Sequence, residues 1–133
     1  MIKRTLKIGR WIADILFAPN GYDIEGVLAC LYDAYAPERI MRQAEELMLG
    51  CEYNCGFTYS NAERKRAVVL IGPTSSGAEF LDTMSHEVHH LAVAIAAGLG
   101  VDLEGETPAY MAGDSVRSLA DVICELGCSR CNK

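Results

Sequence analysis

The order of apolar and polar positions predicts a chain that mixes strands and helices. Residues 5–17 form an apolar stretch that predicts a strand. In an alternative interpretation, which periodicity does not exclude, the chain turns helical around residues 11–16. Residues 19–21, Pro-Asn-Gly, break this stretch. Asp23 can cap a helix that runs to about Tyr35, and Pro37 can begin a second helix that ends near Gly50. The segments GFTYS and AVVLIG, separated by the polar sequence NAERKR, predict two short strands joined by a turn.

The second half of the chain has helical periodicity. A long helix is expected from about Ala78 to Ala97, ending at the glycines that follow. Its core face consists of apolar residues at helical spacing, namely Phe80, Met84, Val88, Leu91 and Ile95. A last helix should begin between Glu104 and Pro108 and run to about Leu126. These elements together predict an α+β fold in a single domain over residues 1–133.

Composition narrows the class of protein. The chain has 133 residues, of which 50% are hydrophobic and 23% charged, as expected of a globular domain. Its formal net charge of −6 argues against binding nucleic acid through the phosphate backbone. The sequence contains no apolar run that could cross a bilayer, so we expect no membrane partner. The N-terminus begins basic and becomes apolar, but Arg10 and Asp14 interrupt it and no cleavage site follows, which favours a cytoplasmic protein.

The loop GPTSSG follows an apolar strand and precedes a helix, as a phosphate-binding loop would. A P-loop requires lysine and then serine or threonine after its second glycine, and Ala78 and Glu79 stand there instead. We therefore do not expect a nucleotide site at this loop.

All three histidines of the chain lie in the long helix, in the sequence HEVHH. His86 and His90 are four residues apart, so both imidazoles can approach one metal ion from the same side of the helix, roughly opposite the core face. His89 points elsewhere and is not expected to be a ligand. Glu87 is adjacent to the pair, where a carboxylate can take a proton from metal-bound water. The pattern H-E-x-x-H thus indicates a metal centre, although a surface helix with scattered histidines would have the same sequence.

A third ligand should come from the helix that follows, because a short turn brings its first residues back toward His90. Glu106 is the preferred candidate, and Glu104 and Asp102 are alternatives that spacing does not exclude. Acidic residues at a helix start are also favoured by the helix dipole without any metal. Tyr110 and Asp114 follow Glu106 at four-residue steps on nearly the same face.

The sequence HEVHH followed by Glu106 in E-T-P-A-Y resembles the gluzincin branch of the zincin metallopeptidases. More narrowly, it is similar to small minigluzincin-like proteins of phages and mobile elements in bacteria, and the resemblance covers residues 66–126. It implies a zincin-like domain in which a small, mostly antiparallel sheet packs against the H-E-x-x-H helix and a glutamate-bearing helix. The larger gluzincins have an aspartate four residues after the glutamate, where this chain has Tyr110.

The function implied by the resemblance is a zinc metallopeptidase acting on a peptide or protein substrate. One Zn²⁺ would be held by His86, His90 and Glu106, and Glu87 would be the general base and later the proton donor to the leaving amine. Tyr110 could donate a hydrogen bond to the developing oxyanion, or it could simply pack. Asp114 could orient a ligand histidine. The strand at residues 67–71 could pair with an extended substrate, or it could be an ordinary core strand.

The six cysteines allow a second site. Cys51 and Cys55 could join Cys124, Cys128 and Cys131 in a structural zinc site, but we expect free thiols before a second metal or a disulfide. Cys30 and Cys124 lie in apolar helical patterns and are expected in the core. The alternative function is a non-catalytic, zinc-stabilised binding or regulatory protein on a peptidase scaffold. A purely structural site has no need of Glu87, which favours the enzyme. The sequence does not indicate an oligomeric state.

Overall fold

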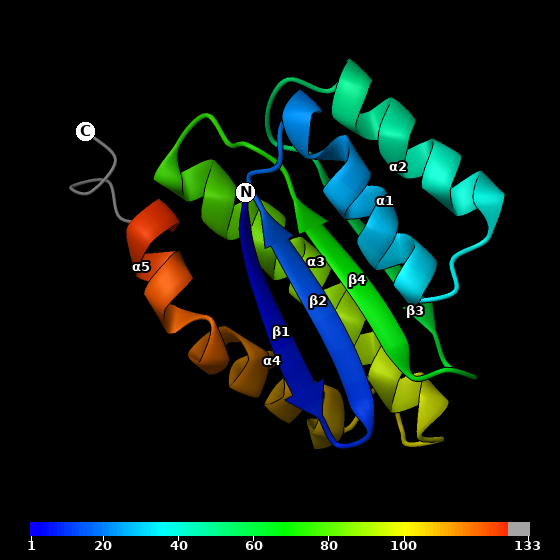
Figure 1. Ribbon diagram of the computed structural model, residues 1–133. Helices are drawn as coiled ribbons and strands as arrows, with labels where there is room; N and C mark the ends of the chain where they lie inside the picture. Colours follow the sequence, from blue (N-terminus) through cyan, green and yellow to red (C-terminus); the bar gives the residue numbers. More distant parts are fainter. Residues whose placement is uncertain (128–133) are drawn as a thin grey trace.

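A four-stranded mixed sheet with helices on both faces organises the protein (Figure 1). The computed structural model describes residues 1–127. The strands are β1 (Ile2–Ile8), β2 (Trp11–Phe17), β3 (Gly56–Asn61) and β4 (Arg66–Ile71), in the order β1-β2-β4-β3. The pairs β1–β2 and β3–β4 are antiparallel, and β2–β4 is parallel. The expectation of an α+β fold with a mostly antiparallel sheet is confirmed.

The N-terminal stretch forms a hairpin of two strands, so the expected strand conformation is confirmed, whereas the single strand and its helical alternative are wrong. Gly9 has φ of 60°, a left-handed conformation that glycine adopts at little cost, and this allows the tight turn between β1 and β2. β2 places alternate residues on the two faces of the sheet. The residues on both faces are mostly apolar and buried, so the sequence of β2 has little alternation of apolar and polar residues.

Each face of the sheet carries its own helical layer. On one face, α1 (Ile24–Asp33) and α2 (Glu38–Gly50) cover Leu16, Val68 and Leu70. On the other face, α3 (Gly77–Gly98) packs its apolar stripe against the alternate residues of β2 and β4. The predicted core residues of this stripe are all buried, namely Phe80, Met84, Val88, Leu91 and Ile95. A short 3₁₀ turn at Gly21–Asp23 precedes α1, and the side chain that caps it is Asn20.

The last helical stretch is two helices, α4 (Glu106–Ser118) and α5 (Ala120–Gly127), where one was expected. The break falls at Leu119, which is fully buried beneath α3 and the sheet. Arg4 on β1 reaches α5 with a hydrogen-bonded ion pair to Asp121, 3.0 Å between nitrogen and oxygen. Gly127 at the end of α5 lies against Gly77, at the start of α3.

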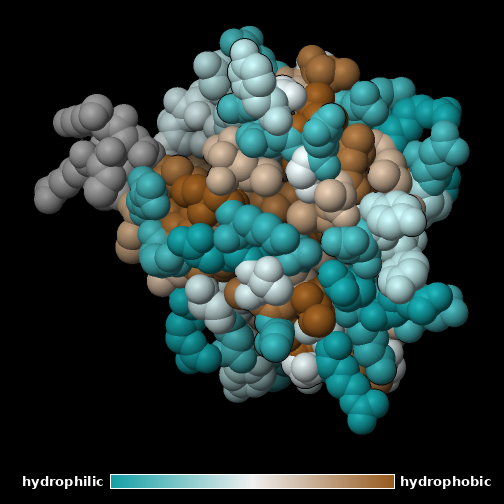
Figure 2. Space-filling view, in the orientation of Figure 1, coloured by the Kyte–Doolittle hydropathy of each residue, from teal (hydrophilic) through white to brown (hydrophobic). Residues whose placement is uncertain are grey.

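The two edges of the sheet differ in charge. β1 exposes Lys3 and Lys7, and lysines on an edge strand discourage pairing with another chain. Figure 2 shows the face that contains β1, where hydrophilic side chains alternate with hydrophobic patches. The opposite edge, β3, has the sequence GFTYSN and no charged residue. β4, which contains residues 67–71, is paired on both sides, so the expectation that this strand has a free edge for substrate is wrong.

Candidate metal centre

Helix α3 carries the three histidines, and its own sequence sets its start and orientation. The Ser76 side chain accepts a hydrogen bond of 3.1 Å from the backbone N–H of Glu79, which caps the helix. The buried apolar stripe then fixes the rotation of α3 against the sheet. Because His86 and His90 lie outside this stripe, both side chains are exposed.

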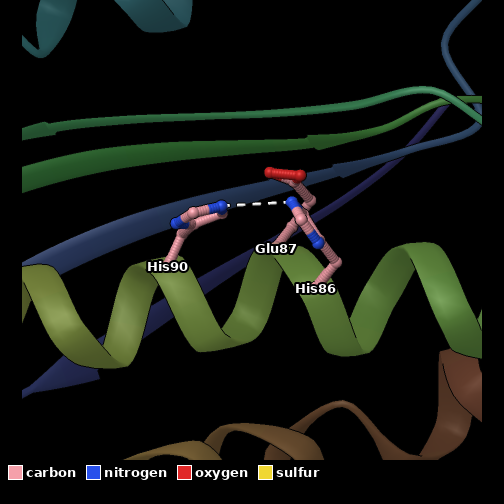
Figure 3. A group of neighbouring side chains, drawn as sticks. All are labelled: His86, Glu87 and His90. Atoms are coloured by element: carbon pink, nitrogen blue, oxygen red, sulfur yellow. Dashed lines mark hydrogen bonds between the residues drawn. The ribbon is translucent and has the colours of Figure 1, made fainter.

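His86 and His90 converge as their spacing predicts. Their Nε2 atoms are 3.1 Å apart, and the two rings meet at an interplanar angle of 76° (Figure 3). Two nitrogens bound tetrahedrally to one zinc ion at the usual bond length are about 3.3 Å apart. The pair is therefore close to the geometry that a shared metal ion requires. His89, as expected, is not part of this pair.

Glu87 is held by strand β3. Its side chain is only 5% exposed, and its Oε1 atom accepts a hydrogen bond of 3.0 Å from the Thr58 hydroxyl. Gly56, two residues earlier on β3, makes room for it, because a Cβ at this position would lie 2.7 Å from Glu87 Cγ. β3 thus supplies both the space and the hydrogen-bond donor for a buried carboxylate next to the histidines.

The donor atoms of His86, Glu87 and His90 lie within 4.8 Å of one another, which makes them a group that could hold a metal ion. The chemistry of the set fits a divalent ion, since two imidazoles and a carboxylate are ligands for zinc and for other first-row metals. Adjacent residues of a helix project about 100° apart, so His86 and Glu87 do not face each other directly. The two histidines are consequently the better-placed ligands, and the carboxylate stands beside them.

Glu106 lies apart from this group, in contrast to the expected ligand set. The predicted residues Glu106, Tyr110 and Asp114 do share one face of α4, but that face is turned to solvent, and Tyr110 is 68% exposed. The inward face of α4 contains Pro108 and Ser115. Figure 3 shows the His86, Glu87 and His90 side chains on one side of α3 and the brown ribbon of the following helices on the other. Glu104 and Asp102 are also exposed and outside the group.

A pocket of 260 Å³ opens beside His86 and Glu87. Its lining residues come from helix α3, from the first residue of β3 and from the loop before it, and they are Asn54, Gly56, Asp82, Thr83, His86 and Glu87. Three positions of the site, Thr58, Gly56 and Asp82, were not expected from the sequence, and Thr83 was expected only as a small residue on the histidine side of the helix. No local pattern indicates the first two, because Thr58 and Glu87 are 29 residues apart and meet only through packing. Asp82 and Thr83 precede His86 and Glu87 by four residues, a spacing that could have identified them.

The cysteines differ from expectation in two ways. Cys51 and Cys55 form a disulfide at the loop that leads into β3, so the expectation of free thiols is wrong for this pair. Cys30 is buried as predicted, and burial raises the pKa of its thiol, but Cys124 is exposed rather than in the core. Cys128 and Cys131 lie outside the described residues.

Comparisons with known proteins identify no relative: no family model, no curated protein and no solved structure matches the chain. The resemblance to gluzincins therefore depends on the site residues themselves. None of the helices in the described part of the chain combines the length and the apolar character needed to cross a membrane.

Proposed function

We propose that this protein is a zinc-dependent peptidase of the gluzincin type, in which His86 and His90 bind the metal and Glu87 is the general base. The observation that carries the proposal is the convergence of the two imidazoles beside a buried carboxylate. The hydrogen bond from Thr58 orients the Glu87 carboxylate beside the histidines. A general base gains from this, because its oxygens must be fixed relative to the water they deprotonate.

The role of each residue follows from its position. The chemistry that a bound zinc ion supplies is acidification of water and polarisation of the scissile carbonyl. His86 and His90 would hold the ion through Nε2. Glu87 would take the proton from the water with one carboxylate oxygen while Thr58 holds the other, and would pass it to the leaving amine.

The edge strand β3 supports a peptide as substrate. β3 pairs with β4 on one side, and its other side is an edge of the sheet. An extended peptide can add to such an edge through main-chain hydrogen bonds. β3 contains neither proline nor a charged side chain, so nothing in its sequence prevents this pairing. Because Gly56 and Thr58 contact Glu87, a peptide along this strand would pass beside the metal group.

A second candidate is a non-catalytic metal-binding module. It is favoured by the position of Glu87 within the donor group and of Glu106 outside it. In such a protein Glu87 would be a ligand, and no separate base would remain.

Two variants distinguish these candidates. In the peptidase, Glu87→Gln should keep one zinc per chain and lose cleavage, because an amide does not accept a proton at neutral pH. In the binding module, Glu87→Gln should lower zinc affinity instead. Glu106→Ala tests the third ligand implied by the resemblance, and it should lower zinc affinity and zinc-dependent stability only if Glu106 reaches the metal. Zinc content by mass spectrometry, cleavage of a peptide library and melts with and without chelator provide the measurements.

A further inference from the structure

The pocket beside His86 has the size of a site for one side chain. Its volume of 260 Å³ is below the roughly 300–1,000 Å³ of pockets that enclose a drug-sized ligand. Two of its lining residues, His86 and Glu87, belong to the metal-binding group. A chemical group that occupies this pocket therefore lies next to the candidate metal ligands.

Two polar side chains in the pocket have no partner among the described residues. Thr83 is only 8% exposed, yet its hydroxyl forms no hydrogen bond within the described part of the chain. No fully buried side-chain nitrogen or oxygen in the described part of the chain lacks a hydrogen-bond partner, so the Thr83 hydroxyl is open to the pocket and can form a hydrogen bond there. Asp82 is exposed and forms no ion pair or hydrogen bond with any described residue. It carries the negative charge of the pocket beyond Glu87.

The Asn54 side of the pocket is held by hydrogen bonds within the protein. The Asn54 side chain donates to Ser75 Oγ at 3.0 Å and accepts from the Ser75 backbone N–H at 3.0 Å. Its own backbone N–H donates to the carbonyl of Pro73 at 2.8 Å. The polar atoms of Asn54 named above are thus already hydrogen-bonded within the protein, and Asp82 and Thr83 are the lining residues whose side chains are free to bind a ligand.

We propose that this pocket binds a positively charged side chain of the substrate, lysine or arginine, with Asp82 as its counter-ion and Thr83 as a further hydrogen-bond acceptor. The inference rests on the proposed peptidase function and names its substrate class. The six lining residues include no lysine or arginine, so no internal cation competes for Asp82. An acidic side chain would face Asp82 and Glu87 together, and an apolar one would displace water from Asp82 and from the Thr83 hydroxyl without replacing its hydrogen bonds.

Matched peptides test the proposal through binding and cleavage. The probes are blocked alanine-based octapeptides with a central lysine, norleucine or glutamate. Binding is measured by calorimetry on zinc-loaded Glu87→Gln protein, and cleavage on wild-type protein. The lysine peptide should be bound and cleaved on the order of tenfold better than the norleucine peptide, as hydrogen bonds to charged groups imply. Asp82→Asn should remove this preference, and Asp82→Lys should shift it toward glutamate.

The control is Glu45→Gln, which removes the same charge from an exposed position of α2, on the other face of the sheet. It should retain the lysine preference. The inference is overturned, and the peptidase function stands, if the lysine and norleucine peptides are bound and cleaved equally well. It is also overturned if the lysine preference is retained in Asp82→Asn. An Asp82-dependent lysine preference in binding without any cleavage overturns the peptidase and leaves the pocket assignment intact. Failure to bind or cleave any of the three peptides overturns the pocket assignment.

Discussion

Gly56 is the position at which a single added methyl group would disturb the candidate site most directly. An alanine Cβ there would lie 2.7 Å from Glu87 Cγ, 2.8 Å from Oε2 and 2.9 Å from Cδ. Favourable carbon–carbon contacts begin at about 3.5 Å, so Glu87 or β3 would have to move by about 0.8 Å. The Glu87 side chain is 95% buried and held by Thr58, so it cannot move without losing packing or this hydrogen bond.

The expected cost of Gly56→Ala follows from two opposing contributions. Overpacking of a buried contact destabilises a protein by about 1–3 kcal/mol. Replacing a glycine within a strand by alanine recovers about 0.5–1 kcal/mol of backbone entropy. The net loss of unfolding free energy should therefore be about 0–2.5 kcal/mol, with a central value of about 1 kcal/mol, and 1 kcal/mol corresponds to a fall in Tm of roughly 3–6 °C for a domain of this size.

The assay is urea unfolding of Gly56→Ala beside a matched control, Gly113→Ala. An added Cβ at Gly113, on α4, meets no atom within 4 Å, so this variant should gain about 0.5–1 kcal/mol. In the proposed peptidase, Gly56→Ala should also lose peptide cleavage, since Glu87 is displaced. If Gly56→Ala is as stable as Gly113→Ala and cleaves peptide normally, the close packing of β3 on Glu87 is wrong.

Three further predictions concern the same structure. Thr58→Val should lower the unfolding free energy by about 1.5–3 kcal/mol in urea titrations, because it removes the hydrogen-bond donor to the buried Glu87 carboxylate. Thr58→Ser keeps a hydroxyl and should have nearly wild-type stability. Equal stability of the two variants would contradict the hydrogen bond between Thr58 and Glu87. Replacing both His86 and His90 by alanine should abolish the one zinc per chain expected in the purified protein, and unchanged metal content would place the metal elsewhere. The hydrogen bond from Arg4 lowers the pKa of Asp121, so this ion pair stabilises the folded state at pH values above the unfolded pKa of about 3.9 and loses its effect as the pH falls through the lower folded pKa. The difference in unfolding free energy between wild type and Arg4→Gln should therefore shrink in acid. A constant difference from about pH 7 to 2 would refute the role of the pair.

Elements with strong local signals were predicted from the sequence. The core stripe of α3, its glycine-terminated end and the β3–β4 pair around a polar turn are each encoded within a few neighbouring residues. The N-terminal hairpin was missed, because β2 is buried on both faces and lacks alternation. The break between α4 and α5 was missed because leucine is helix-compatible; it is the backbone of Leu119, with φ of −104° and ψ of 11°, that leaves the helical conformation while its side chain stays in the core.

The rotation of α4 about its axis could be predicted in part from the sequence. Pro108, Met111, Ser115 and Leu119 recur at helical spacing and form the side of α4 that faces the protein. That stripe places Glu106 and Tyr110 on the outside. The expectation that they face His90 came from the short turn and the resemblance, and neither specifies the rotation of a helix about its own axis.

The sequence by itself determined which side chains one helix can bring together. His86, Glu87 and His90 are within one turn of α3, and the geometry of a turn is local. Only the tertiary structure decided what surrounds them. Thr58 and Gly56 meet Glu87 across 29 and 31 residues because β3 lies at the edge of the sheet above α3, and Asp82 becomes part of a pocket because the loop before β3 closes it. Such contacts depend on sheet order and helix rotation, which are set by the burial of the whole core and not by any short stretch of sequence.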